Sequence, residues 1–263
     1  MREWAASVGR RTFDGIAEMG LAAALLVESL AFVVTGRSRR QPVRLEAVVR
    51  QAVEMGLGAL PIVTVLSFSI GMMVAIQGIY SLAIFGAESK VTFGVALSVT
   101  REFAPLITGI LVAGRSGSAL AARLGTMRIN EEISALTVMG INPVRYLVAP
   151  PLLAMVIMLP ALTWYADCVA LLGAGLYISA DLGVSMAAYF EELQTVCKVG
   201  DIVHGVGKSA LFAVLITLVG VVNGSGVTGG AEGIGRVTTR SVVHAISAIV
   251  IADMIFAFLA TRG

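Results

Sequence analysis

The sequence predicts an all-α integral membrane protein, and three observations lead to that prediction. Of the 263 residues, 57% are hydrophobic and only 14% are charged, whereas soluble domains carry about 25% charged residues. The mean hydropathy is +0.89. Several apolar runs are long enough for a membrane helix of about 20 residues, and the longest uncharged run covers residues 55–87. The net charge of +2 gives no indication of nucleic-acid binding.

The N-terminal region predicts a helix that lies in the membrane interface. Between residues 10 and 35, apolar side chains recur three or four positions apart, while Asp14 and Glu18 lie one turn from each other. This is the pattern of an amphipathic interfacial helix. The apolar run at residues 21–27 leaves a first membrane span open as the alternative.

A basic cluster, the densest in the chain, follows this helix. It consists of Arg37, Arg39, Arg40, Arg44 and Arg50. Because such clusters stay in the cytoplasm, we expect residues 1–54 to be cytoplasmic or interfacial and residues 55–262 to form the membrane domain. The N-terminus lacks an uninterrupted apolar core with a cleavage site, so no cleaved signal peptide is expected.

Five membrane spans are predicted from the hydropathy of the remaining chain. We expect them at about residues 57–80, 91–119, 146–166 with a continuation to about 175, 209–231 and 241–260. The second span contains Arg101 and Glu102, and a charge at mid-bilayer costs about 2.5–3.5 kcal/mol. Adjacent residues on a helix point about 100° apart. At least one of the two is therefore expected to face another group.

Small residues recur toward the end of the second predicted span, after Arg101 and Glu102. Gly114, Gly117 and Ala121 have nearly the small-xxx-small spacing that favours close helix packing. A short surface helix is predicted next, at about residues 130–140. Its Ile133, Leu136 and Met139 form an apolar stripe at helical spacing.

The start of this surface helix has the residues expected of a helix N-terminus. Asn130 is a plausible N-cap, and Glu131 and Glu132 favour the positive end of the helix dipole. The arginine-rich segments precede span one, separate spans two and three, and separate spans four and five. The N-terminus is therefore predicted to be cytoplasmic and the C-terminus to lie on the other side.

Two segments resemble nucleotide-binding motifs without their context. The sequence GSGVTG at 224–229 matches GxGxxG but follows an apolar span rather than a strand, and GVGKS at 205–209 lacks the first glycine of a Walker A loop. The histidines and cysteines of the chain do not have the spacing of metal ligands; they are His204, His244, Cys168 and Cys197. We expect no catalytic residue, metal site or cofactor in this chain.

A resemblance to a known family is carried by residues 101–150, which read REFAPLITGILVAGRSGSALAARLGTMRINEEISALTVMGINPVRYLVAP. They are similar to the signature region of the MlaE/YrbE family, the permease subunits of ABC transporters that work with MCE proteins to move lipids. IGMMVAIQG at 70–78 and RVTTRSVVH at 236–244 support it. The resemblance covers about residues 40–262.

The resemblance implies a homodimer of five-span subunits in the bacterial inner membrane. Its implied partners are ABC ATPase subunits, which carry ATP and magnesium, a periplasmic ring of MCE-domain protein and, in Gram-negative relatives, a small STAS-domain protein. The implied substrate is phospholipid, and the implied role is maintenance of outer-membrane lipid asymmetry. Sterol or fatty-acid transport, as in actinobacterial relatives, is the alternative.

The resemblance also implies an outward-open lipid pocket at the dimer interface. The candidate residues for this pocket are Gln77, Tyr80, Arg101, Glu102, Arg236, Arg240 and Asp253. A buried arginine would suit an anionic headgroup. As the alternative, Arg101 and Glu102 pair with other helices across the dimer.

Residues 130–140 correspond in the resemblance to a coupling helix that docks on the ATPase. The candidate residues for this contact are Asn130, Glu131, Glu132, Ile133, Leu136 and Met139. The apolar stripe could instead pack on the chain's own spans. Two other functions remain open: a self-sufficient secondary transporter with Glu102 and Asp253 as a proton relay, and a membrane scaffold that only anchors partners.

Overall fold

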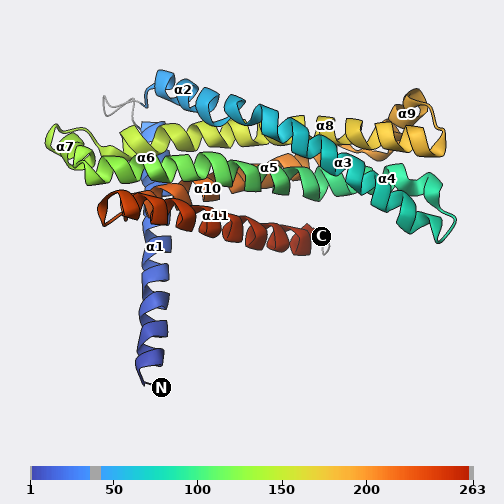
Figure 1. Ribbon diagram of the computed structural model, residues 1–263. Helices are drawn as coiled ribbons and strands as arrows, with labels where there is room; N and C mark the ends of the chain where they lie inside the picture. Colours follow the sequence, from blue (N-terminus) through green and yellow to red (C-terminus); the bar gives the residue numbers. More distant parts are fainter. Residues whose placement is uncertain (1, 36–42, 261–263) are drawn as a thin grey trace.

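The computed structural model describes residues 2–35 and 43–260, and within these ranges every regular element is helical (Figure 1). Six of the helical segments in the described ranges are long and apolar enough to cross a membrane. The predicted all-α membrane class is therefore confirmed. Arg37, Arg39 and Arg40 of the predicted basic cluster lie outside the described residues.

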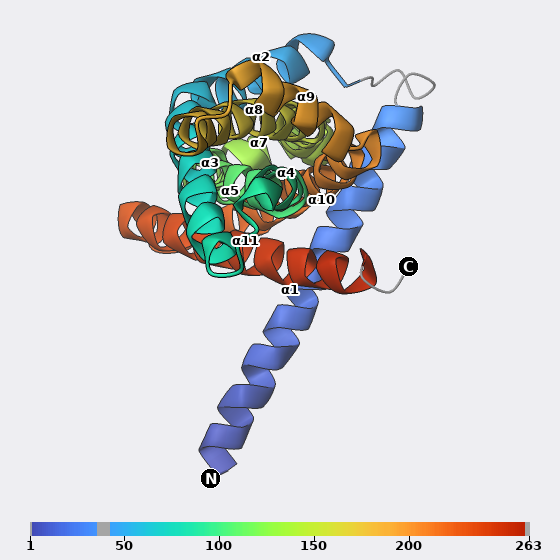
Figure 2. The same cartoon turned by 90° about the vertical axis from the view of Figure 1, so that its right-hand side faces the viewer.

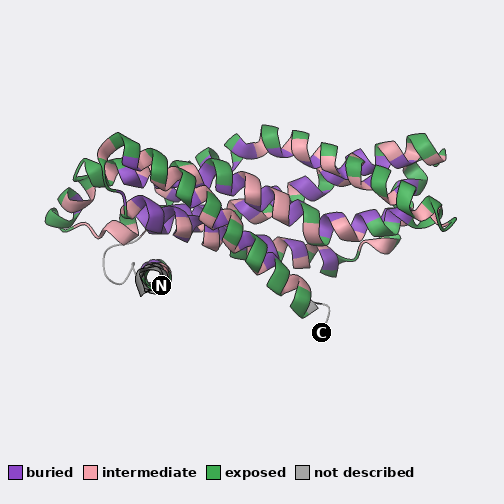
Figure 3. Cartoon of the chain, turned by 60° about the horizontal axis from the view of Figure 1, so that its bottom comes forward, coloured by how far each residue is buried: buried purple, intermediate pink, exposed green. Residues whose placement is uncertain are grey.

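Most of the long helices lie side by side along one direction (Figure 1). The elements of this bundle are α2 (Leu45–Met55), α3 (Leu60–Ala83), α4 (Val91–Ser98), α5 (Ala104–Val112), α6 (Ser118–Ile129), α8 (Ala149–Leu182), α10 (Val199–Ser225) and α11 (Gly230–Ala260). α4, α5 and α6 form one continuous rod, because π-helical turns at Val99–Phe103 and Ala113–Gly117 join them. Figure 3 shows buried residues through the middle of the bundle and exposed ones on its outside and at its ends.

The fourth span begins earlier than the sequence suggested. Residues 199–208 were expected to belong to a polar connection, but α10 already starts at Val199, and a separate helix α9 (Met186–Val196) precedes it. The predicted start of this span was wrong because Asp201 and Lys208 lower the hydropathy of residues 199–208. Both are buried, and neighbouring helices neutralise their charges.

Helix α1 (Arg2–Thr35) runs across the bundle, and its N-terminal half projects away from the other helices (Figures 1 and 2). Only 11% of its most apolar window, in Gly15–Val34, is buried. A helix lying across the spans is oriented as an interfacial helix would be if the bundle crosses the membrane. By length and composition alone, the same helix could also be a span.

Glycines bring the bundle helices into backbone contact. A Cβ at Gly71 of α3 would lie 1.9 Å from the carbonyl oxygen of Ala170 of α8. A Cβ at Gly224 of α10 would lie 2.7 Å from the Ala121 oxygen, and one at Gly220 would lie 3.0 Å from the Gly117 oxygen. The predicted close packing is confirmed for Gly117 and Ala121.

Gly114 does not share in this contact. No atom lies within 4 Å of the position that its Cβ would take. The spacing prediction was wrong for this residue, because the π-helical turn Ala113–Gly117 interrupts the regular α-helical faces on which that prediction depended.

Candidate functional site: a buried ion cluster

Lys208, in the middle of α10, is the centre of a group of charged side chains inside the bundle. Its side chain is 0% exposed. The Nζ atom lies 2.7 Å from Glu102 Oε2 and 2.6 Å from Asp253 Oδ1, and it donates a hydrogen bond to the Arg101 carbonyl oxygen at 2.9 Å. An ammonium group has three protons. Two of these protons are donated to Glu102 Oε2 and the Arg101 carbonyl, and Asp253 balances the charge as an ion pair.

Arg101 pairs with a third carboxylate, that of Asp201, which lies on α10 like Lys208. Its Nε donates to Asp201 Oδ1 at 2.7 Å, and its Nη2 contacts the same oxygen. Asp201 Oδ2 accepts from the backbone N–H of Lys198 at 3.0 Å, at the first turn of α10. Here the name ion cluster denotes Arg101, Glu102, Asp201, Lys208 and Asp253.

The local backbone explains why Arg101 and Glu102 both reach α10. They lie on the π-helical turn Val99–Phe103, whose hydrogen bonds span five residues instead of four. Such a turn rotates successive side chains less than an α-helix does. Pro105 has no N–H to offer the Arg101 carbonyl four residues earlier, and that carbonyl accepts Lys208 instead.

Gly205 lets α10 approach this turn. A Cβ at position 205 would lie 2.1 Å from the Thr100 carbonyl oxygen, which real side chains do not allow. The GVGKS segment therefore has a packing explanation. Its first glycine brings two helices together, and its lysine, one turn later, enters the resulting contact.

The ion cluster holds two cations and three carboxylates, so it is not a basic site. Arg101 is already paired with Asp201, although its side chain is 48% exposed. The expectation that Arg101 or Glu102 faces another group is confirmed, since both contact α10. Within this chain both residues pair with α10, and pairing across a dimer stays a prediction.

The other pocket candidates lie elsewhere. Gln77 and Tyr80 are exposed on α3. Arg236 and Arg240 are exposed near the start of α11 and line an open groove of about 690 Å³. Arg240 pairs with Glu18 of α1. Arg240 and Asp253 are 13 residues apart on one helix, a separation of about 20 Å, so these basic residues do not join the ion cluster.

The short helix after α6 differs from the expectation at its start. It is α7 (Glu132–Val138), and the residue before it, Glu131, has a left-handed backbone with φ of 61°. Asn130 is not its N-cap. It ends α6, and its amide donates to Glu132 Oε1 at 3.2 Å. The cause is a sharp reversal of the chain between α6 and α7, where a left-handed residue replaces an extended capping residue.

The apolar stripe of α7 faces mainly inward. Leu136 is only 9% exposed and belongs to the core, and Ile133 packs against it. The expectation that Leu136 is available to a partner was therefore wrong for this chain. The exposed apolar residues are Val138, at 89%, and Met139, at 64%. Glu131 and Glu132 are exposed beside them.

Two members of the ion cluster, Lys208 and Asp201, were missed from the sequence. A signal was present, because Asp201, Gly205 and Lys208 are spaced at i, i+4 and i+7 and so share one helix face. Among the described residues, no group of three histidine, cysteine, aspartate or glutamate side chains could hold a metal ion. In its resting arrangement, the ion cluster joins three helical segments through charges.

Comparison with known proteins gives consistent matches over most of the chain. The family model described as "Permease MlaE" matches residues 48–259. A probable ABC transporter permease protein of Rickettsia conorii is 31% identical over 247 residues, which are 94% of this chain and 93% of that protein.

Two further relatives come from distant sources. The intermembrane phospholipid transport system permease protein MlaE of Haemophilus influenzae is 36% identical over 208 residues, covering 79% of this chain and 80% of that protein. The chloroplastic protein TRIGALACTOSYLDIACYLGLYCEROL 1 of Arabidopsis thaliana is 33% identical over 214 residues, covering 81% and 61%. With the family match and these identities taken together, the chain belongs to the MlaE permease family.

Proposed function

We propose that this chain is the membrane subunit of an ATP-driven transporter that moves phospholipid. Its family membership and the name of the Haemophilus relative support this proposal. The observation that carries it is the rod Glu88–Ile129, which bears Arg101 and Glu102 of the ion cluster and ends next to α7. One continuous helical element thus connects a surface suited to a partner with a buried charged site.

In this proposal, the partner surface of α7 consists of Val138 and Met139 flanked by Glu131 and Glu132. A separate ATPase subunit, which holds ATP and magnesium, docks there. Its closure shifts the rod relative to α10 and α11. The pairs that are most sensitive to such a shift are Arg101 with Asp201 and Lys208 with Glu102, because each joins the rod to α10.

The chemistry of the proposed lipid step follows from the charges. While Arg101 is held by Asp201, the ion cluster has no unpaired cation for a phosphate. A shift that separates this pair frees a half-exposed guanidinium, which can bind a phosphate with two parallel hydrogen bonds. The exposed apolar residues of α3 and α11 provide surface for acyl chains. Headgroup binding is thereby tied to the position of the rod.

The assembly and location belong to the same proposal. We place the chain in a bacterial inner membrane as a homodimer, with a cytoplasmic N-terminus, a periplasmic C-terminus and a periplasmic ring of MCE-domain protein. A STAS-domain protein joins the ATPases, and the system maintains outer-membrane lipid asymmetry. The distribution of arginine between the loops supports the orientation.

Reconstitution tests the proposed activity. The full-length chain, with the proteins that copurify from its native membrane, is placed in vesicles that contain fluorescent phospholipid or fluorescent sterol. We expect ATP-dependent transfer of the phospholipid, reduced about tenfold or more in Arg101→Ala and unchanged in Lys90→Ala. Lys90 is a matched control because it is exposed and outside the ion cluster.

Other outcomes would contradict parts of the proposal. Transfer that proceeds without ATP and follows a proton gradient would favour a secondary transporter that uses Glu102 and Asp253. Preferential transfer of sterol would show that the substrate is a sterol rather than a phospholipid. Full transfer by both Arg101→Ala and Glu102→Ala would show that this chain is a scaffold and that the ion cluster only stabilises it.

A further inference from the structure

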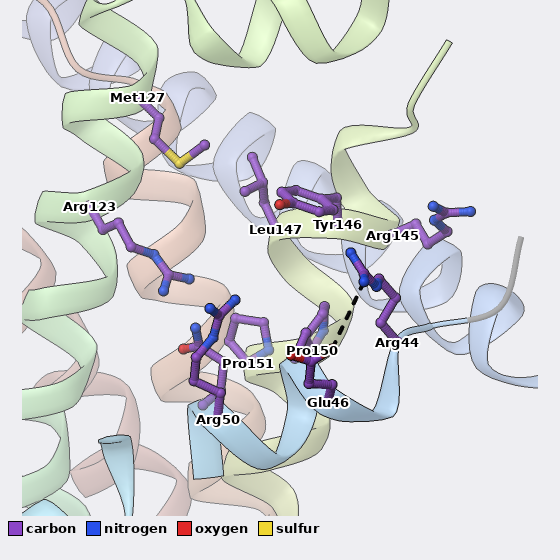
Figure 4. A pocket seen from close by; sticks show the side chains of 12 residues that line it. Arg44, Glu46, Arg50, Arg123, Met127, Arg145, Tyr146, Leu147, Pro150 and Pro151 are labelled. Atoms are coloured by element: carbon purple, nitrogen blue, oxygen red, sulfur yellow. Dashed lines mark ion pairs between the residues drawn. The ribbon is translucent and has the colours of Figure 1, made fainter. Parts of the chain in front are cut away.

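A second charged site lies at the opposite end of the rod from the ion cluster. It is a pocket of about 460 Å³ between α2, α6 and the π-helical turn Val144–Val148 that precedes α8. Four arginines line it: Arg44, Arg50, Arg123 and Arg145. Figure 4 shows Arg50 and Arg123 directed toward each other from α2 and α6, with Arg44 beside them and Arg145 at the edge of the pocket. In the following, this site is called the basic pocket.

The positive charge of the basic pocket is only partly compensated, although Glu54, which does not line the pocket, also acts on Arg123. Glu46 is the only acidic residue in the lining, and it lies 3.9 Å from Arg44. In the ranges that the structure describes, the ion pairs include none of Arg50, Arg123 and Arg145. Arg123 and Arg145 are also partly buried. Like charges held together in a partly buried space favour an anion as their partner.

Other features of α2 favour the same kind of ligand. The helix begins at Leu45, and Arg44 before it provides no side-chain cap. The first N–H groups and the positive end of the helix dipole are thus available at the pocket. Arginine side chains with free backbone N–H groups are the usual ligands of phosphate oxygens.

An exposed apolar strip lies on the outer side of α2. Leu45, Val49 and Val53 are exposed and are spaced four residues apart, so they form one line along the helix. The residues of α2 that pack inward are Val48, Gln51 and Met55. Leu147, Pro150 and Pro151 add a buried apolar wall to the pocket. The strip does not line the pocket, but it starts at Leu45, between Arg44 and Glu46 of the lining. A ligand with a phosphate and an attached hydrocarbon chain can therefore cover both, whereas a free phosphate leaves the strip uncovered.

We propose that the basic pocket binds the headgroup phosphate of an anionic phospholipid from the surrounding leaflet, with an acyl chain along Leu45, Val49 and Val53. By the predicted orientation this is the cytoplasmic leaflet, where basic pockets between membrane helices bind anionic headgroups. The site is separate from the ion cluster, because Arg101 and Arg123 are 22 residues apart on one rod, or about 33 Å. It does not depend on the proposed transport.

Native mass spectrometry of the full-length chain in detergent tests this proposal. The probes are dioleoyl phosphatidylglycerol, dioleoyl phosphatidylcholine and inorganic phosphate. For the unmodified chain, we expect at least about tenfold tighter binding of phosphatidylglycerol than of phosphatidylcholine. The double variant Arg50→Gln with Arg123→Gln should lose that preference.

A matched control is available on the same helix. Arg128→Gln removes one positive charge from α6, as Arg123→Gln does within the double variant, but Arg128 is exposed and does not line the pocket. We expect the control to keep the preference for phosphatidylglycerol. If the double variant does not fold, Arg145→Gln replaces it. Val49→Asp provides an independent test, since it should weaken phosphatidylglycerol binding while leaving all four arginines in place.

Three results would overturn the proposal. The first is an unchanged preference for phosphatidylglycerol in the double variant. The second is displacement of phosphatidylglycerol by millimolar inorganic phosphate together with no effect of Val49→Asp, which would identify a site for a soluble anion. The third is a double variant that still binds lipid but no longer copurifies with a partner protein, which would show that the pocket binds a protein. Loss of lipid transfer alone bears on the proposed function and not on this site.

Discussion

At the scale of single residues, Lys208 shows how a charge is accommodated inside an apolar bundle. Two of its protons are donated to the Arg101 carbonyl and to Glu102, both on the π-helical turn of the rod, and Asp253 of α11 pairs with its charge. Breaking such a buried pair by removing one partner costs about 3–5 kcal/mol, because the remaining charge is left uncompensated. Lys208 therefore has structural importance that its position in a GVGKS segment does not reveal.

Replacing Lys208 tests this interpretation. In Lys208→Met, Glu102 and Asp253 lose their shared cation, and we expect stability to fall by about 3–5 kcal/mol, measured by thermal unfolding in detergent. Lys90→Met, at an exposed position, should be neutral. The triple variant with Glu102→Gln and Asp253→Asn should recover much of the loss, since it removes the uncompensated charges as well. Purely additive losses would show that the three residues do not act as one unit.

A second residue-scale prediction concerns Gly205. In Gly205→Ala, the new Cβ would meet the Thr100 backbone oxygen and force α10 away from the π-helical turn. We expect a loss of about 1–3 kcal/mol, typical of overpacking. Gly207→Ala is the matched control, because nothing lies within 4 Å of its Cβ position. Equal thermal midpoints for the two variants would refute the close contact.

At the scale of elements, the sequence pattern predicts that α7 is a helix, but packing decides which of its sides is buried. The stripe of Ile133, Leu136 and Met139 correctly predicted a short amphipathic helix. It could not show which side of that helix meets the chain itself. The structure buries Leu136 and leaves Val138 and Met139 outside, so the candidate surface for a partner is rotated from the predicted one.

Variants of α7 distinguish these two sides. Val138→Glu should leave folding within about 0.5 kcal/mol of the original, yet release the ATPase in a pull-down from native membranes. Leu136→Ala should instead destabilise the chain by about 2–4 kcal/mol, as expected for a buried leucine. Retention of the ATPase by Val138→Glu and by Met139→Glu would argue against a docking role for this surface.

At the scale of the whole molecule, helix α1 lies across the direction of the bundle helices. Its composition allows a span, whereas its direction across the bundle favours the interface. The two arrangements place the ends of α1 differently. An interfacial helix keeps both ends on one side, and a span separates them.

Cysteine labelling decides between these arrangements. After Cys168 and Cys197 are replaced by alanine, single cysteines are placed at the exposed positions Phe13 and Val34. We expect a membrane-impermeant maleimide to label both from the cytoplasmic side. Leu259→Cys, near the other end of the chain, should react only from the opposite side. Labelling of positions 13 and 34 from opposite sides would establish a sixth span.

The parts of the molecule that could be predicted from the sequence are those that depend on whether a segment prefers lipid or water. Long apolar runs identified the helices, and the unusual Arg101 and Glu102 identified one side of the ion cluster. Lys208 and Asp201 were missed because hydropathy treats each charge as a sign of water. Only the folded arrangement shows that carboxylates and a lysine from distant positions cancel one another. The basic pocket was predicted only in part, since Arg44 and Arg50 belong to the basic cluster seen in the sequence, whereas Arg123 and Arg145 join them only through helix packing.

The position of Lys208 has a consequence for biogenesis. Lys208 leaves the ribosome before Asp253, which lies in the next helix, so one of its two carboxylate partners arrives later. Glu102 and the Arg101 carbonyl, which are synthesised earlier, are then its available partners. Because an unpaired lysine inside the hydrocarbon region costs up to about 2.5–3.5 kcal/mol on the insertion scale, insertion of α10 is favoured when the earlier rod remains beside the insertion site. The order of synthesis and the order of assembly are thereby linked through one side chain.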